Sequence, residues 1–174
     1  LRDLDALTRA MAEAQPDIVF HLGAQALVRE SYRDPKTTFD TNVGGAVNVC
    51  EAVGRVESIR TLVFITSDKC YRNVNWEWGY RETDVLGGRD PYSASKGCAE
   101  VVFAAYWTSF LSKSGRINAA VTRAGNVIGG NSYAGIELYG AGTSSNTVAG
   151  NFIGTDATGT ANFGNGGDGV ALVS

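Results

Sequence analysis

Apolar residues recur at helical spacing in three segments of the first two thirds of the chain. Residues 3–14 carry one apolar stripe and residues 35–56 carry a longer one, and the spacing in each predicts a helix with one buried face. A third helix is expected from about residue 92 to residue 112, in a largely apolar segment that begins after a proline. Three helices with a buried face are therefore expected in this part of the chain.

Three shorter segments lie between or after these helices and have the pattern of strands. Residues 18–24 and 61–66 are apolar on both faces, which is typical of buried parallel strands, and residues 117–123 supply a third strand. Strands that alternate with helices in this order require right-handed crossovers and a parallel sheet. The expected fold class for residues 1–125 is therefore α/β, a partial Rossmann-like parallel sheet with flanking helices.

Polar residues follow each predicted strand at the point where it ends. Ala24 and Gln25 follow the first strand, Ser67-Asp68-Lys69 follows the second, and Arg123 ends the third. In open parallel sheets, ligands lie outside the carboxyl ends of the strands. These residues are therefore expected to converge where this fold class binds a ligand.

A tyrosine and a lysine lie four residues apart in the segment Asp90-Pro91-Tyr92-Ser93-Ala94-Ser95-Lys96, at the start of the third predicted helix. One helical turn separates Tyr92 from Lys96, so both side chains stand on one face of the helix. An ammonium group at this distance favours the phenolate, which makes a general base from a weak acid. The same spacing also joins unrelated surface residues, and spacing alone leaves both interpretations open.

The composition narrows the class of partner. The 174 residues carry a formal net charge of -3 at a pI of about 5.1, so no basic face favours nucleic acid or an anionic membrane. No apolar run has the length of a membrane span and no signal-peptide pattern is present, although a chain that begins at Leu1 could have lost a leader. Cys50, Cys70 and Cys98 have no metal-ligand spacing, which indicates reduced thiols and no metal site.

The composition changes near residue 125. Arg123 is the last basic residue, and the segment after it consists mainly of Gly, Asn, Ser, Thr and Ala. Asn-x-Ile-Gly recurs in this segment after 25 residues and Gly-(Ile/Val)-x-Leu recurs after 34 residues, which favours short strands stacked as a parallel β-helix. A disordered glycine-rich linker is the alternative. Two domains are expected, a Rossmann-like domain at 1–125 and a short, all-β, β-helix-like segment at 126–174.

Four motifs of the first domain resemble those of the extended short-chain dehydrogenase/reductase superfamily. They are His21-Leu22-Gly23-Ala24-Gln25, Thr41-Asn42-Val43-Gly44-Gly45, Thr66-Ser67-Asp68-Lys69-Cys70-Tyr71 and Tyr92-Ser93-Ala94-Ser95-Lys96, in the same order as in the superfamily. Within it, Ser67-Asp68-Lys69, the loop 75–80 and the segment 122–130 are similar to the CDP-glucose 4,6-dehydratase family. The resemblance covers residues 1 to about 130, and the tail is similar to the repeats of bacterial parallel β-helix proteins.

The resemblance implies an NAD-dependent lyase that converts CDP-glucose to CDP-4-keto-6-deoxyglucose. Tyr92 is then expected to take the proton of the sugar's 4-hydroxyl while NAD accepts the hydride from C4, and Ser67 is expected to bind the same hydroxyl. Lys96 is expected to hold the nicotinamide ribose. Ala24 and Gln25 are expected to bind the cofactor at the end of the first strand.

Loss of water across C5 and C6 requires one acid and one base. Asp68 and Lys69 stand where related dTDP-glucose dehydratases carry Asp-Glu, so the resemblance implies that Asp68 protonates the departing 6-hydroxyl and Lys69 removes the C5 proton. Asn126 is expected to contact the substrate phosphates and Asn42 to support the site. Arg123 either pairs with the diphosphate or merely ends a strand.

Several of these residues also have a plain structural interpretation. His21, the only histidine, is favoured as a satisfied strand residue over an acid or base. Asp68 and Lys69 could form a solvated ion pair after a strand. The aromatic residues Trp76, Trp78 and Tyr80 could stack on a sugar or pack within their own loop.

No glycine-rich pyrophosphate-binding turn precedes residue 18, where this fold normally carries one. We therefore expect a chain truncated relative to the family, with an apolar strand edge left bare at residues 18–24. Such a chain, alone, is expected neither to hold NAD tightly nor to dehydrate CDP-glucose. The segment 126–130 fits both the dehydratase pattern and the β-helix repeat, which indicates a chimera, either a real fusion or a product of misjoined sequence reads.

Two other functions remain open from the sequence. One is a β-helix repeat protein that binds carbohydrate or a cell surface and retains a relic dehydratase segment. The other is a nucleotide-sugar epimerase or another dehydratase, although an epimerase needs no acid and base for elimination. The family resemblance implies a cytoplasmic homo-oligomer that binds a nucleotide sugar, whereas the β-helix segment alone suggests an exported protein.

Overall fold

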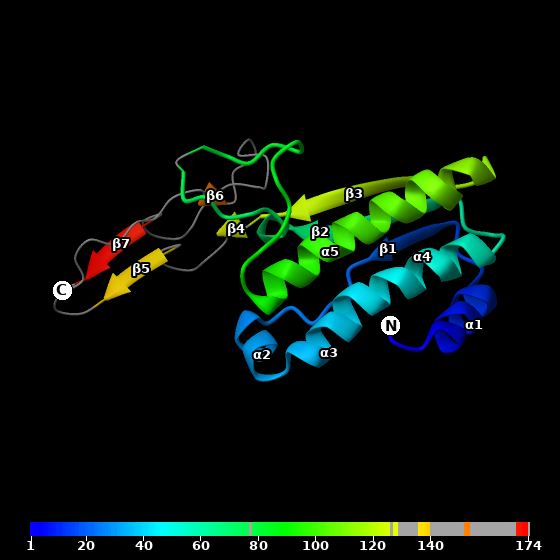
Figure 1. Ribbon diagram of the computed structural model, residues 1–174, viewed down its shortest axis with the longest axis horizontal. Helices are drawn as coiled ribbons and strands as arrows, with labels where there is room; N and C mark the ends of the chain where they lie inside the picture. Colours follow the sequence, from blue (N-terminus) through cyan, green and yellow to red (C-terminus); the bar gives the residue numbers. More distant parts are fainter. Residues whose placement is uncertain (77, 126, 129–135, 140–151, 154–169, 174) are drawn as a thin grey trace. The chain divides into compact units, whose positions relative to one another are not determined.

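Figure 1 shows the computed structural model, which describes residues 1–76, 78–125, 127–128, 136–139, 152–153 and 170–173. The chain divides into two compact units. The first consists of Leu1–Val74 with Tyr80–Arg123, and the second of Asn75–Gly79 with Ala124–Ser174.

Helices and strands alternate along the first unit, as the sequence predicts. Its helices are α1 (Leu4–Ala14), α2 (Val28–Arg33), α3 (Pro35–Phe39), α4 (Gly45–Arg55) and α5 (Pro91–Tyr106). Its strands are β1 (Ile18–His21), β2 (Thr61–Ser67) and β3 (Asn118–Ala124). The α/β class expected for this part of the chain is therefore confirmed.

The three strands form one sheet in the order β1-β2-β3, with β2 in the middle. β1 and β2 are parallel, in a register that pairs Ile18 with Thr61. β3 runs in the same direction, because its first residue, Asn118, donates its backbone N–H to Arg60 O (2.8 Å), and the Thr66 hydroxyl near the end of β2 reaches Thr122 O (3.3 Å). All three strands therefore end at the same edge of the sheet.

The hydrophobic core lies between one face of this sheet and the helices α4 and α5, which pack against each other (Figure 1). Phe64 of β2 is buried there, with its ring centroid 5.2 Å from that of Phe103 on α5. Val49 and Val53 of α4 are also buried in this cluster. Through their apolar stripes, α4 and α5 pack against the sheet and against each other. This packing fixes the position of α5 and of the side chains it carries.

The opposite face of the sheet is more open than the sequence predicts. Ile18 and Phe20 of β1 are 51% and 61% exposed, so the expectation that residues 18–24 are buried on both faces is wrong for these side chains. Only the face that carries the core is covered by helices of the first unit. The strand itself ends at His21, three residues before its expected end, because Leu22 to Ala24 make no ladder pairs with β2.

The predicted helix at 35–56 has an interruption. A π-helical turn, Asp40–Gly44, joins α3 to α4 and contains the buried Asn42. The helix predicted to reach residue 112 is α-helical to Tyr106 and continues as a π-helical turn, Trp107–Leu111. The π-helical turn at Asn42 is of interest because such turns are frequent at functional sites.

The helix α2 was not predicted from the sequence. It contains six residues, too few for a periodic apolar stripe to stand out. Leu27, its N-cap residue, donates its backbone N–H to Gln25 Oε1 (2.6 Å), but no side chain of the described residues caps the first turn of α2. The sequence before α2 therefore lacks the common N-cap signals, which favour Ser, Thr, Asp and Asn.

The second unit contains two parallel pairs of strands. β4 (Val127–Ile128) pairs with β6 (Phe152–Ile153), and β5 (Ile136–Tyr139) pairs with β7 (Val170–Val173). Most residues that predict the β-helix, including the turn at 155–163, lie outside the described residues. Asn126, the expected phosphate contact, lies outside them too.

Candidate active site

The predicted Tyr92–Lys96 pair lies on the first turns of α5, and both residues are 8% exposed. Asp90 begins the helix, because its Oδ1 accepts the backbone N–H of Ser93 (3.0 Å), and Pro91 occupies the first helical position. The Lys96 ammonium nitrogen lies 6.0 Å from the centroid of the Tyr92 ring. Burial lowers the pKa of Lys96. The alternative interpretation, two surface residues that share a helical turn by chance, does not fit this burial.

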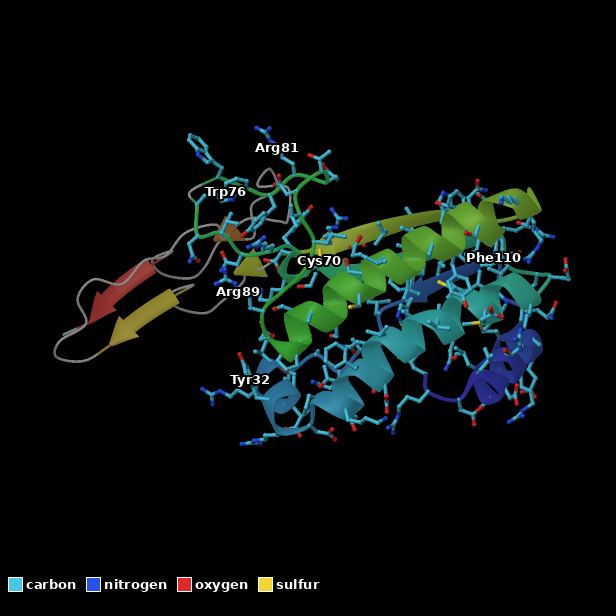
Figure 2. The ribbon with its side chains drawn as sticks, in the orientation of Figure 1. Tyr32, Cys70, Trp76, Arg81, Arg89 and Phe110 are labelled. Atoms are coloured by element: carbon cyan, nitrogen blue, oxygen red, sulfur yellow. The ribbon has the colours of Figure 1, made fainter. Side chains whose placement is uncertain are left out.

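Ser67 is the last residue of β2, and Asp68 and Lys69 lie in the short turn after it, which packs against α5. The Ser67 hydroxyl donates to Asp68 Oδ1 (2.9 Å) and accepts the Lys69 backbone N–H (3.3 Å). Lys69 Nζ donates to the same Asp68 oxygen at 3.1 Å, and the two side chains are 38% and 37% exposed. Cys70, labelled in Figure 2, ends the turn. A carboxylate and an ammonium group are thus held in contact, partly exposed to solvent, at the end of the central strand.

The buried carboxamide of Asn42 links three parts of the site. Its Oδ1 accepts the Gln25 backbone N–H (2.7 Å), and its Nδ2 donates to Gln25 O (3.1 Å) and to Ser95 Oγ (2.8 Å). Ser95 in turn donates to the carbonyl oxygen of Tyr92 (2.7 Å). The segment after β1, the π-helical turn and the Tyr92 turn of α5 are therefore held together through one side chain. Support of a catalytic site by Asn42 stays a prediction.

Gln25 uses its side chain within the chain. Its Oε1 accepts the Leu27 backbone N–H, and its Nε2 donates to Leu27 O (3.1 Å) and to the Thr38 hydroxyl (2.8 Å). Ala24, the residue before it, is half-buried. Cofactor binding by Ala24 and Gln25 stays a prediction.

His21, at the end of β1, is buried and packs on Phe64, with ring centroids 4.6 Å apart. Burial and the nearby Lys96 ammonium lower the pKa of His21 to about 4. The imidazole is therefore neutral at physiological pH. This environment fits the structural interpretation of His21 that the sequence favours.

Arg123 forms a bidentate ion pair with Glu100 of α5. Its Nε and Nη2 donate to the two carboxylate oxygens at 3.0 and 2.8 Å, and its Nη1 donates to the Tyr71 hydroxyl at 2.6 Å. Sequence reasoning did not single out Glu100, although it is the only acidic residue of α5. A lone carboxylate in a buried helix was the signal available, since such groups are almost always paired.

The aromatic loop after this turn is divided between packing and exposure. The ring of Tyr80 stacks on that of Tyr71, with centroids 4.8 Å apart and an interplanar angle of 11°. Trp76, labelled in Figure 2, and Trp78 are 47% and 77% exposed. Packing thus accounts for Tyr80, while a sugar-stacking role of the tryptophans stays a prediction.

Two kinds of feature are absent from the residues that the structure describes. No group of three or more His, Cys, Asp or Glu side chains is placed there to hold a metal ion. No helix in these residues is long and apolar enough to cross a membrane.

Comparison with known proteins gives a consistent family. Residues 1–126 match the protein-family model described as GDP-mannose 4,6 dehydratase. A CDP-glucose 4,6-dehydratase from Salmonella typhimurium is 50% identical over 138 residues, which cover 77% of this chain and 38% of that protein.

Solved structures show the same likeness. The UDP-glucose 4-epimerase of Thermus thermophilus, in complex with NAD, is similar with a TM-score of 0.61 at 30% identity, over 74% of this chain and 40% of that one. A dTDP-glucose 4,6-dehydratase double mutant from Streptomyces venezuelae, with NAD and DAU bound, shares the fold with a TM-score of 0.63 at 23% identity, over 74% and 37%. The chain thus spans less than half the length of these relatives.

Proposed function

The chain belongs to the GDP-mannose 4,6-dehydratase family, and from this premise we propose that the complete protein is an NAD-dependent nucleotide-sugar 4,6-dehydratase. The proposed substrate is CDP-glucose and the product CDP-4-keto-6-deoxyglucose, since the most similar relative named above is a CDP-glucose 4,6-dehydratase. The observation that carries the proposal is the Asp68–Lys69 pair, an acid in contact with a base on a turn packed against the helix of Tyr92 and Lys96.

Oxidation at C4 is assigned to the residues on α5. Tyr92 takes the proton of the 4-hydroxyl, and Ser67 accepts or donates a hydrogen bond at the same oxygen. Lys96 places its positive charge beside the Tyr92 ring, 6.0 Å from the ring centroid. NAD, when bound, supplies the group that takes the hydride from C4 and later returns it at C6.

The residues present fit this cofactor at its reacting end. A buried ammonium beside a phenol offers the donors that ribose hydroxyls need. Lys96 and Tyr92 would therefore hold the nicotinamide ribose, and Ala24 and Gln25 would contact the cofactor beyond β1.

Elimination is assigned to the turn after β2. The step uses the pair in its neutral form, in which the Lys69 ammonium has given its proton to the Asp68 carboxylate along their hydrogen bond. The 4-keto group acidifies the C5 proton, which the neutral Lys69 amine removes, and the Asp68 carboxyl gives its proton to the 6-hydroxyl as it leaves as water. Hydride at C6 and a proton at C5 then complete the 4-keto-6-deoxy sugar. We assign Asn126 to the substrate phosphates and Asn42 to the support of Tyr92. Two assignments stay open for Arg123: contact with the substrate diphosphate, or a purely structural role near the end of β3.

Further proposals concern the organisation of the protein. The domain boundary is placed at residue 125, with a Rossmann-like domain before it and a β-helix-like segment at 126–174. The parallel pairs β4–β6 and β5–β7 support the latter, because their partners stand 25 and 34 residues apart, the same intervals as the sequence repeats. A cytoplasmic homo-oligomer is proposed by family resemblance alone.

The test is the substitution Lys69→Met in the complete protein. We expect the alkali-absorbing 4-keto-6-deoxy product to disappear, while oxidation at C4 continues, because Tyr92 and Lys96 are unchanged. Lys113→Met, at an exposed lysine on the turn Ser112–Ser114, is the matched control and should leave turnover intact. Unchanged dehydration in the Lys69 variant would remove Lys69 from the mechanism.

An epimerase is the second candidate, and it is favoured by the likeness to the UDP-glucose 4-epimerase described above. An epimerase oxidises the 4-hydroxyl to a ketone and then reduces that ketone again, without loss of water. The two functions are separated by mass, since a dehydratase product is lighter than its substrate by one water and an epimerase product has the same mass. Lys69→Met is expected to leave epimerase turnover intact.

A further inference from the structure

Glu100 is a buried carboxylate for which the mechanism above has no use. It is 4% exposed and lies one helical turn after Lys96 on α5. Arg123 binds both of its oxygens, and the Thr66 hydroxyl donates to one of them. A buried charge is tolerated when it is paired and hydrogen-bonded, and Glu100 meets both conditions.

The partners of Glu100 bracket the turn that carries Asp68 and Lys69. Thr66 precedes Ser67 by one residue and binds Glu100 directly. Tyr71 follows the turn and reaches Glu100 through Arg123, whose Nη1 donates to the Tyr71 hydroxyl (2.6 Å) while its guanidinium carbon lies 4.8 Å from the centroid of the Tyr71 ring. Both ends of the turn are therefore tied to one side chain of α5.

The same contacts occupy Arg123. Three of its nitrogens donate within the chain, two of them to Glu100, and its side chain is 18% exposed. The carboxylate also cancels the positive charge that would attract a diphosphate. A bidentate fork of this kind fixes geometry as well as charge.

We propose that Glu100 is a positioning residue, which with Arg123 holds the Asp68–Lys69 turn in place against the Tyr92–Lys96 turn of α5, a role that rests on the dehydratase function proposed above. Tyr92 and Lys96 have their own supports on α5, Asp90 and the Asn42–Ser95 contact. Loss of Glu100 therefore loosens the turn more than it moves Tyr92. Elimination depends on Glu100, and oxidation at C4 depends on it much less.

The first experiment measures hydrogen exchange by mass spectrometry on this 174-residue chain, in wild type and in Glu100→Gln. We expect faster exchange in the peptide that covers residues 67–72, and unchanged exchange in α1 and α4. Glu51→Gln is the matched control, because Glu51 also pairs with an arginine, Arg55 (3.1 Å), but on α4. Unchanged exchange at 67–72, or an equal rise in all peptides, overturns the proposal.

Glu100→Gln leaves the partly buried Arg123 guanidinium beside a neutral amide and is open to misfolding. Thr66→Val keeps the shape of residue 66 and removes the hydroxyl, which donates to Glu100 and also reaches Thr122 O. We expect the same local increase in exchange, at smaller amplitude, in this variant. If Glu100→Gln does not fold, Thr66→Val decides the question by the same criterion.

The second experiment measures kinetics in the complete protein. Because a displacement of about 1 Å costs on the order of a hundredfold in rate, we expect Glu100→Gln to lower kcat for dehydration by at least about tenfold, with KM within about threefold of wild type. The C4-oxidised sugar should accumulate, since elimination becomes the slow step. Arg123→Lys should lower kcat as well. A rise in KM at unchanged kcat would instead make Arg123 a substrate ligand and overturn the proposal.

The two experiments separate this role from the function on which it rests. If the wild-type complete protein releases no keto sugar from any nucleotide sugar, the dehydratase function is wrong. Even then, faster hydrogen exchange in Glu100→Gln that is confined to residues 67–72 would show that Glu100 holds the turn. If the wild type dehydrates its substrate and Glu100→Gln does so at the wild-type rate, the function stands and the positioning role is wrong.

Discussion

The side chain of Asn42 pairs with the backbone of Gln25 in both directions, as a neighbouring strand would. It accepts the Gln25 N–H at 2.7 Å and donates to the Gln25 carbonyl oxygen at 3.1 Å. The segment after β1 makes no strand pairs in its register with β2, so this carboxamide satisfies backbone groups that the sheet leaves free. The third contact, to Ser95, transmits the position of that segment to α5.

Asn42→Ala is expected to destabilise the chain by about 2–3 kcal/mol, because it leaves the N–H and the carbonyl of Gln25 without their partner in a partly buried site. Urea unfolding followed by circular dichroism measures the loss. Asn48→Ala, whose side chain makes an exposed contact to Leu1 O (2.8 Å), is the control and should cost less. Equal losses in the two variants would contradict the bridging role of Asn42.

The stability of the chain is expected to fall as the pH decreases from about 6.5 to about 4, through His21. Its pKa is lower in the folded state, so the unfolded chain binds the proton first and acid favours unfolding. The shift from 6.5 to about 4 corresponds to about 3 kcal/mol, lost in full below pH 4. Unfolding free energies of wild type and His21→Gln, compared between pH 4 and 7.5, measure this contribution. Parallel curves for the two proteins would be inconsistent with a neutral, buried imidazole.

The three cysteines are expected to differ in reactivity. Burial raises the pKa values of Cys50 and Cys70 to about 12, whereas Cys98 is exposed on α5. Because the thiolate is the reactive form, a disulfide reagent should modify Cys98 first in the native protein and all three thiols after unfolding in urea. Cys98→Ser should remove the fast reaction. Rapid modification of Cys70 in the native state would show that the turn after β2 opens readily.

Removal of the cap of α5 is expected to affect the site and the stability together. Asp90→Ala should cost about 1 kcal/mol, the usual loss for an N-cap, and should loosen the first turn, which carries Tyr92. Burial raises the pKa of Asp90, but the hydrogen bonds from Ser93 outweigh this and lower it overall, so the cap weakens as acid protonates the carboxylate. Asp34→Ala removes the same kind of cap from α3 and is the control. Thermal unfolding and hydrogen exchange in residues 91–96 compare the two variants. Equal exchange in these residues would show that the turn of Tyr92 does not depend on the Asp90 cap.

The sequence predicted those parts of the fold that follow from local spacing. β2 was predicted from its apolar run, and the burial of Tyr92 and Lys96 agrees with the face expected from their four-residue spacing. The exposure of Ile18 and Phe20 does not follow from the apolar pattern of the strand, because it depends on what covers the second face of the sheet.

The contacts that organise the site join residues far apart in the chain. Gln25 meets Asn42 across 17 residues, and Glu100 meets Arg123 across 23. No rule of local spacing relates such pairs, since their distance is set by how the helices pack on the sheet. The chemical groups at the strand ends could thus be named from the sequence, while the groups that hold them in place required the structure.

Parallel pairing also sets the order in which this chain can fold. Ile18 pairs with Thr61, and the residue before Thr61 binds Asn118, so each pairing closes a loop that contains at least one complete helix. Contacts of such long range slow folding relative to helical hairpins of the same size. β2 is the only described strand with a neighbour on each side. On the ribosome, β1 can therefore pair with β2 only after residues 61–67 have been synthesised.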